Sequence, residues 1–197
     1  MSESSTQVGS SFRGHLVALI GLLYGLAIAT GTGDAISHWF DQHYSGDKHQ
    51  MLLLSAAAFL LGVADFVIYH LTIAKCSYRS VTRLVLDLGF PTLIFVLFNI
   101  TADLGHYLLL LLLYFIGTHV YLYLLKKDQC RMSRLYWLTV AFLTMPVVLA
   151  YVQTIRSFWP WIGQNLVIVI VVDCFFYFVV NMILANQELK MTVPRRT

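Results

Sequence analysis

HLVALIGLLYGLAIATGTGDAISHWF, residues 15–40, is an apolar stretch long enough for a helix to cross a lipid bilayer. Small residues recur in it at intervals of four, so they fall on one helical stripe: Gly21, Gly25, Ala29, Gly33 and Ser37. In lipid, helices associate through such stripes because their backbones can approach closely. We expect this stripe to pack either within the subunit or against a neighbouring protomer, where it could also line a pore.

Further apolar stretches of similar length follow along the chain. They cover residues 51–74, 81–101, 105–125, 135–155 and 161–185. Of the 197 residues, 58% are hydrophobic and 12% are charged, which lies outside the range of soluble domains. We therefore predict an all-α, polytopic transmembrane bundle of about six spans. It forms a single integral membrane domain over residues 1–197, with a short cytoplasmic head (1–14) and a short tail (186–197).

The positions of lysine and arginine predict the orientation of the spans. If the N-terminus is cytoplasmic, all of the 13 basic residues except Lys48 and Arg156 lie in inner segments. This split follows the positive-inside rule, so both termini are predicted to be cytoplasmic. Trp39 then lies at the outer interface and Trp137 at the inner one, where aromatic belts occur. We predict an N-in, C-in membrane protein.

Polar side chains inside the spans are the candidates for a functional site, because a charge in the hydrocarbon core is costly and normally faces the bundle interior or water. Counted from the inner ends of the spans, they fall between mid-membrane and the inner interface: Asp65, His70, Asp87, His119, Asp173 and Asn181. Arg83 lies one helical turn before Asp87, so these two side chains can neutralise one another. The shared depth predicts a pathway for cations or protons, with His70 and His119 as pH-sensitive neighbours.

A basic cluster at the predicted cytoplasmic face is the candidate site for an anionic ligand. It comprises Arg79, Lys126, Lys127, Arg131 and Arg134. Such clusters hold the topology, and they also bind anionic lipid head groups or nucleotides. No glycine-rich phosphate loop accompanies the cluster. The positive charge is therefore the only feature that indicates a nucleotide ligand. We expect no binding of duplex nucleic acid.

In its layout of several helices, short loops and a basic cytoplasmic face, the chain resembles the small multi-span membrane effector subunits of bacterial antiphage defence. The resemblance implies a location in the bacterial inner (plasma) membrane. It also implies that a nucleotide signal made by a partner opens the membrane protein, with the loops around Arg79 and Lys126–Arg134 receiving the ligand. Our principal hypothesis is a homo-oligomeric ion channel or pore, gated by an anionic cytoplasmic ligand in a defence or stress-response setting. An oligomer is expected because six short spans leave little room for a wide pore in one subunit.

Other function classes remain open. A membrane electron carrier would use His70 and His119 as axial haem ligands. A proton-coupled transporter would use the same carboxylates, and an accessory subunit would only hold a partner in the membrane. Gly31–Asp34 is similar to the GxGD motif of intramembrane aspartyl proteases. The companion Tyr-Asp motif of that family is absent and Asp34 lies near the membrane surface, so we predict that the protein is not an enzyme.

Acidic and histidine side chains near the outer face have the donor types of a divalent metal site. They include Asp47, His49, Asp103 and His106. Their spacing matches no known ligand framework, so we predict solvated loop residues, with no bound metal and no cofactor.

Overall fold

The computed structural model describes residues 3–41, 47–72, 81–127, 134–156 and 165–192. Their helices are α1 (Glu3–Phe40), α2 (Lys48–Thr72), α3 (Val81–Asn99), α4 (Leu104–Lys127), α5 (Arg134–Arg156) and α7 (Leu166–Thr192). Each predicted span corresponds to one of these helices, and no strand occurs among the described residues, so the all-α prediction is confirmed. Five helices are long and apolar enough to cross a membrane, while α5 contributes the shorter apolar stretch Val140–Ile155. The chain is therefore an integral membrane protein.

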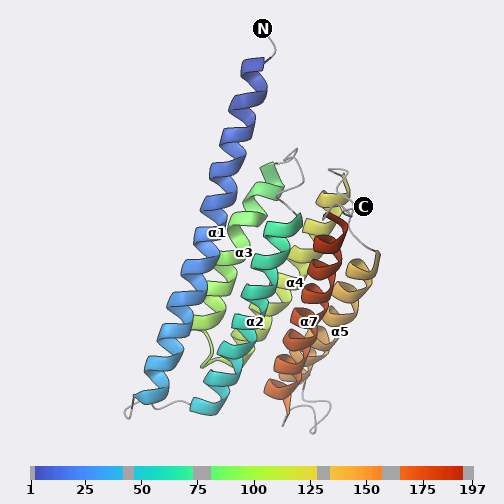
Figure 1. Ribbon diagram of the computed structural model, residues 1–197. Coiled ribbons are helices and arrows are strands. Elements are labelled where there is room, and N and C mark those ends of the chain that lie inside the picture. Colours follow the sequence, from blue (N-terminus) through green and yellow to red (C-terminus); the bar gives the residue numbers. More distant parts are fainter. Residues whose placement is uncertain (1–2, 42–46, 73–80, 128–133, 157–164, 193–197) are drawn as a thin grey trace.

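The helices pack in two layers (Figure 1). In one layer α2 lies between α1 and α7, and in the other α4 lies between α3 and α5. The layers meet where α1 packs on α3, where α2 packs on α3 and where α5 packs on α7. The start of α1 and the end of α7 lie at the same end of the bundle (Figure 1).

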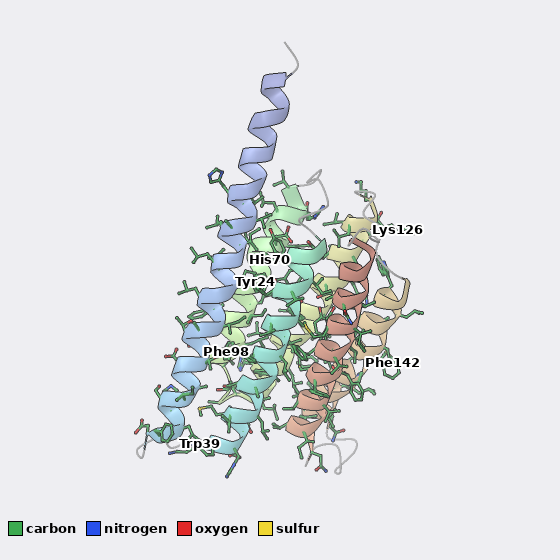
Figure 2. All side chains as sticks on the ribbon, in the orientation of Figure 1. Tyr24, Trp39, His70, Phe98, Lys126 and Phe142 are labelled. Carbon is green, nitrogen blue, oxygen red and sulfur yellow. The ribbon has the colours of Figure 1, made fainter. Side chains whose placement is uncertain are left out.

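The first and last helices extend beyond the predicted spans. α1 begins at Glu3, and its first turns project past the other helices (Figure 1). α7 continues to Thr192. Much of the predicted head and tail is therefore helical. Trp39 and Lys126 lie at opposite ends of the bundle, on the sides predicted for the outer and inner interfaces (Figure 2).

Two of the acidic residues near the outer face cap helices. Asp47 precedes α2, and its Oδ1 accepts hydrogen bonds from the backbone N–H groups of His49 (2.9 Å) and Gln50 (3.1 Å). Asp103 precedes α4 in the same way and accepts the N–H of His106 (3.0 Å), while its Oδ2 contacts the His106 Nδ1 at 2.6 Å. These bonds satisfy backbone donors that a helix start otherwise leaves unpaired. The His106 backbone N–H, followed by its side chain, holds the pKa of Asp103 below its ordinary value.

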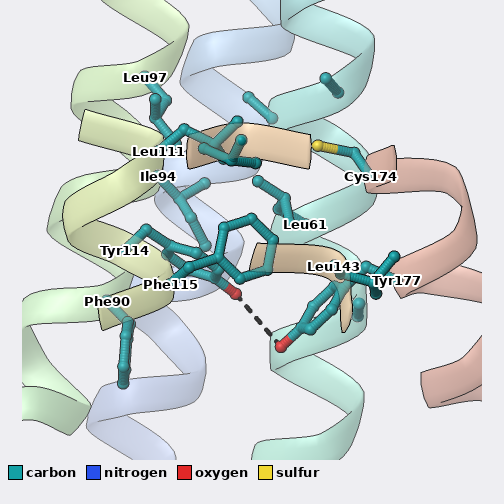
Figure 3. Close-up of a cluster of buried hydrophobic side chains, with 14 of the residues drawn as sticks. Leu61, Phe90, Ile94, Leu97, Leu111, Tyr114, Phe115, Leu143, Cys174 and Tyr177 are labelled. Carbon is teal, nitrogen blue, oxygen red and sulfur yellow. Dashed lines mark hydrogen bonds between the residues drawn. The ribbon is translucent and has the colours of Figure 1, made fainter. Parts of the chain in front are cut away.

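The space between the two layers is filled by apolar side chains (Figure 3). Leu61 of α2, Ile94 and Leu97 of α3, and Leu111 of α4 are fully buried there. Tyr107 of α4 crosses this core and donates a hydrogen bond to the carbonyl oxygen of Leu54 in α2 (2.8 Å). The middle of the bundle is therefore closely packed on the side of the predicted outer face.

The predicted stripe of small residues on α1 faces the bundle only at Gly21. A methyl group added at Gly21 would lie 3.0 Å from the imidazole of His70 on α2. Gly25, Ala29 and Gly33 are exposed on the outside of the bundle. Of these four residues, Gly21 alone packs within the subunit. Packing of the other three against a neighbouring protomer stays a prediction.

A different face of α1 packs against the bundle. Its buried residues recur at steps of three or four: Leu16, Ile20, Tyr24, Ala27, Gly31 and Ala35. At Gly31, an added methyl group would lie 2.2 Å from the Cγ of Phe98 on α3, well inside contact distance. The two helices cross at this glycine, and Phe98 is labelled at the crossing in Figure 2. The crossing positions Tyr24, two turns away, against α2.

Candidate functional site

A small polar chamber lies inside the bundle, in the half nearer the predicted cytoplasmic face. Its volume is about 30 Å³, and its walls come from α1, α2, α3 and α4: Tyr24, Asp65, Ile68, Tyr69, Asp87, Phe90, Thr118 and Tyr121. A cavity of about 10–15 Å³ already accommodates one water molecule if polar partners line it. This site, the Asp65 chamber, therefore has room for water or a small cation beside two carboxyl groups.

Tyrosine hydroxyls converge on Asp65. Tyr177 of α7 donates to Asp65 Oδ1 at 2.9 Å, and Tyr24 of α1 donates to Asp65 Oδ2 at 3.4 Å. Tyr114 of α4 donates in turn to the Tyr177 hydroxyl at 3.5 Å, the bond drawn dashed in Figure 3. An ionised carboxylate only accepts hydrogen bonds, so the direction of these bonds suits a charged Asp65. The network joins four helices through one acidic side chain.

The second carboxyl group of the chamber, Asp87, shares α3 with a buried arginine. Arg83 and Asp87 lie one turn apart and are 0% and 1% exposed. The Arg83 guanidinium carbon lies 5.9 Å from the centre of the Tyr121 ring, which also lines the chamber. With all three groups ionised, Asp65, Asp87 and Arg83 carry one net negative charge. In an apolar interior such an excess is costly, so the site favours one proton or one monovalent cation.

The two histidines predicted beside the carboxylates are held by their own helices. The Nδ1 of His70 lies 2.9 Å from the Phe66 carbonyl oxygen, and the Nδ1 of His119 lies 2.8 Å from the Phe115 carbonyl oxygen. A carbonyl oxygen only accepts, so each Nδ1 is a donor. His70 also stacks edge-on against Tyr69, with ring centres 5.5 Å apart, which places it next to the chamber. The Nε2 of His70 lies against Gly21. A haem iron bound to this nitrogen would have to occupy the space that Gly21 fills.

The polar residues of α7 are divided between two places. Tyr177 reaches the Asp65 chamber, and Asn181 is buried with its Nδ2 bonded to the Tyr177 carbonyl oxygen at 2.8 Å. Asp173, one turn towards the predicted outer face, lines a separate crevice between α5 and α7. The structure therefore brings Asp65 and Asp87 together and leaves Asp173 outside their site.

The predicted site residues did not include the tyrosines that surround Asp65. Tyr24, Tyr114 and Tyr177 all lie inside predicted spans and are at most 2% exposed. A buried tyrosine hydroxyl usually finds a hydrogen-bond partner, and in an apolar span the acceptors are few. A tyrosine at the same depth as an intramembrane aspartate was therefore the sequence signal that could have identified these residues as hydrogen-bond partners of Asp65.

The basic cluster is only partly within the described residues. Lys126 and Lys127 are exposed at the C-terminal end of α4, where positive charge also complements the helix dipole. Arg134 begins α5. Arg79 and Arg131 lie outside the described residues.

Among the residues that the structure describes, no three His, Cys, Asp or Glu side chains are grouped so that they could hold a metal ion. Neither known protein families, nor curated protein sequences, nor solved structures match the chain significantly.

Proposed function

We propose that the protein conducts protons or small cations across the membrane, as a channel or pore, and that the Asp65 chamber is its ion site. The observation that carries the proposal is a chamber lined by two carboxyl groups inside an otherwise apolar membrane bundle. Intramembrane carboxylates of this kind normally mark ion or proton pathways. Binding of a single cation or proton neutralises the site.

The hydrogen-bonded tyrosines suit a proton relay. The oxygens of Tyr114, Tyr177, Asp65 and Tyr24 follow one another at 3.5, 2.9 and 3.4 Å. Each hydroxyl can rotate, so accepting a proton at one end and releasing one at the other requires little movement of heavy atoms. This route would carry a proton between the chamber and the centre of the bundle.

The described conformation corresponds to a closed state in this proposal. The residues on the outer side of the chamber are fully buried leucine and isoleucine side chains, among them Leu61, Ile94 and Leu111. Hydrophobic constrictions gate channels by excluding water. Conduction would therefore require these side chains to separate.

Assembly from several copies is part of the proposal and is supported by α1. Gly25, Ala29 and Gly33 present a small, exposed face on which another membrane helix can approach closely. Gating by an anionic ligand stays a prediction, supported by the exposure of Lys126 and Lys127 at the predicted cytoplasmic end. The defence setting also stays a prediction.

Ion flux through the purified protein in liposomes tests the proposal. Leu61→Thr weakens the hydrophobic layer and is expected to raise cation or proton flux above that of the wild type. Adding Asp65→Asn to that variant is expected to lower the flux by at least about tenfold, because the neutral amide removes the charge that attracts the ion. Asp34→Asn, the same change at an exposed position of α1, serves as the control.

Two results would contradict the proposal. One is a flux in the Leu61→Thr protein that Asp65→Asn leaves unchanged, since the ion would then bypass the chamber. The other is the absence of flux from the correctly folded Leu61→Thr protein. Thermal unfolding of each variant in detergent shows whether it is folded.

A further inference from the structure

We propose that the crevice between α5 and α7 is a binding site for lipophilic organic cations, with Asp173 as the counter-charge. The crevice has a volume of about 800 Å³, within the range of small-molecule sites. Its walls are almost wholly apolar and include Phe142 and Pro146 of α5 and Val172 and Phe176 of α7. This proposal does not rest on ion conduction through the Asp65 chamber.

Asp173 is the feature that gives the crevice chemical character. Its side chain is 5% exposed, and its Oδ2 has no hydrogen-bond partner among the described residues. It lies seven residues after the start of α7, so it is about 10 Å inside the apolar zone. A buried carboxylate without a partner is costly, and a bound cation would remove that cost.

The described part of the crevice wall provides no such cation. Of the described residues that line the crevice, none is basic. The buried arginine, Arg83, lies on α3, which belongs to the opposite layer and borders neither side of the crevice. For an ionised Asp173, a bound organic cation would supply the counter-charge that these described residues do not.

The shape and charge of the crevice favour one kind of occupant. A lipid acyl chain would cover the apolar walls but leave Asp173 unmatched. A second copy related by a twofold axis would bring its own Asp173 towards the first, and like charges repel. An organic cation with a bulky apolar body matches both features. The rings of Phe142 and Phe176, which are 75% and 56% exposed, add faces that attract a cation. Figure 2 shows Phe142 on the outer side of α5, where a ligand can enter from the bilayer.

Binding of tetraphenylphosphonium to the full-length protein tests this proposal, with tetraphenylborate as an anion of matched size and shape. We expect saturable binding of the cation and none of the anion, measured by equilibrium dialysis in detergent. Asp173→Asn is expected to weaken cation binding by at least about tenfold. Asp34→Asn and Asp65→Asn are expected to leave it unchanged, which separates this site from the Asp65 chamber.

A second variant tests the volume independently of the charge. Val172 is 46% exposed on the crevice wall, so Val172→Trp fills the crevice without disturbing the core, and it is expected to abolish binding. Equal binding of cation and anion would overturn the proposal, because the crevice would then be only an apolar surface. So would wild-type affinity in folded Asp173→Asn or Val172→Trp protein.

Discussion

Replacing Gly31 by alanine should loosen the contact between α1 and α3. The added methyl group would lie 2.2 Å from Cγ, 2.4 Å from Cδ2 and 2.7 Å from Cβ of Phe98. The Cβ of Phe98 is attached to the backbone, so rotating the ring cannot relieve the whole clash and α1 must move away from α3. Overpacking of this kind costs about 1–3 kcal/mol. Alanine regains about 0.5–1 kcal/mol as the better helix former, which leaves a net destabilisation of about 0.5–2 kcal/mol.

Gly89 on α3 provides the matched control. No side chain or neighbouring helix lies within 4 Å of a methyl group added there, so Gly89→Ala should be neutral or slightly stabilising. Thermal or denaturant unfolding in detergent gives both values. The double variant Gly31→Ala with Phe98→Ala should lose less stability than the two single changes added together, because the two contacts with the ring are then absent and only the contact with Cβ remains.

A Gly31→Ala protein as stable as Gly89→Ala would refute the reasoning. It would mean that α1 does not cross α3 at this glycine, and the position of Tyr24 against Asp65 would lose its support. If the crossing is as described, the movement of α1 should also weaken the Tyr24 hydrogen bond to Asp65. The Asp65-dependent flux of the Leu61→Thr protein would then fall in Gly31→Ala and remain in Gly89→Ala.

Two further predictions follow from the hydrogen bonds. Tyr177→Phe should lower stability by about 1–2 kcal/mol, because it removes the 2.9 Å bond to Asp65 and the acceptor of Tyr114. Tyr24→Phe should cost less, since its bond is 3.4 Å long, and the reverse order in unfolding experiments would show that the network is not as described. The pKa of Asp103 is lower in the folded protein than its ordinary value of 3.8, so the ionised side chain stabilises the fold at pH values above 3.8. This contribution is lost as the pH falls through the lowered pKa. Asp103→Asn keeps a capping oxygen but cannot titrate, so the difference in stability between wild type and variant should shrink below about pH 4. A constant difference from about pH 6 to about pH 3 would exclude this role.

The number and approximate limits of the helices were predictable because they depend on local sequence. The apolar stretch at 81–101 became α3, Val81–Asn99, and that at 105–125 became α4, Leu104–Lys127. Such a stretch has to match the thickness of the hydrocarbon core and satisfy its backbone internally, and both requirements act on one helix at a time. The burial of Asp87, and the place of Asp65 on the inward face of α2, also followed from the cost of exposing charge to lipid.

Which polar residues meet was decided only by the tertiary structure. Depth along a span predicted Asp65, Asp87 and Asp173 as one cluster, yet Tyr177 is the residue of α7 that reaches Asp65. Depth fixes a position along the membrane normal, whereas contact also requires the neighbouring helix and the rotation of each helix about its axis. On α1 the sequence carries two sets of small residues, and only the presence of Phe98 on α3 makes Gly31 the closely packed one. Sequence thus determined a membrane bundle with acidic groups inside it. Helix order and rotation, set by side-chain packing between helices, determined the Asp65 chamber and the separate crevice at Asp173.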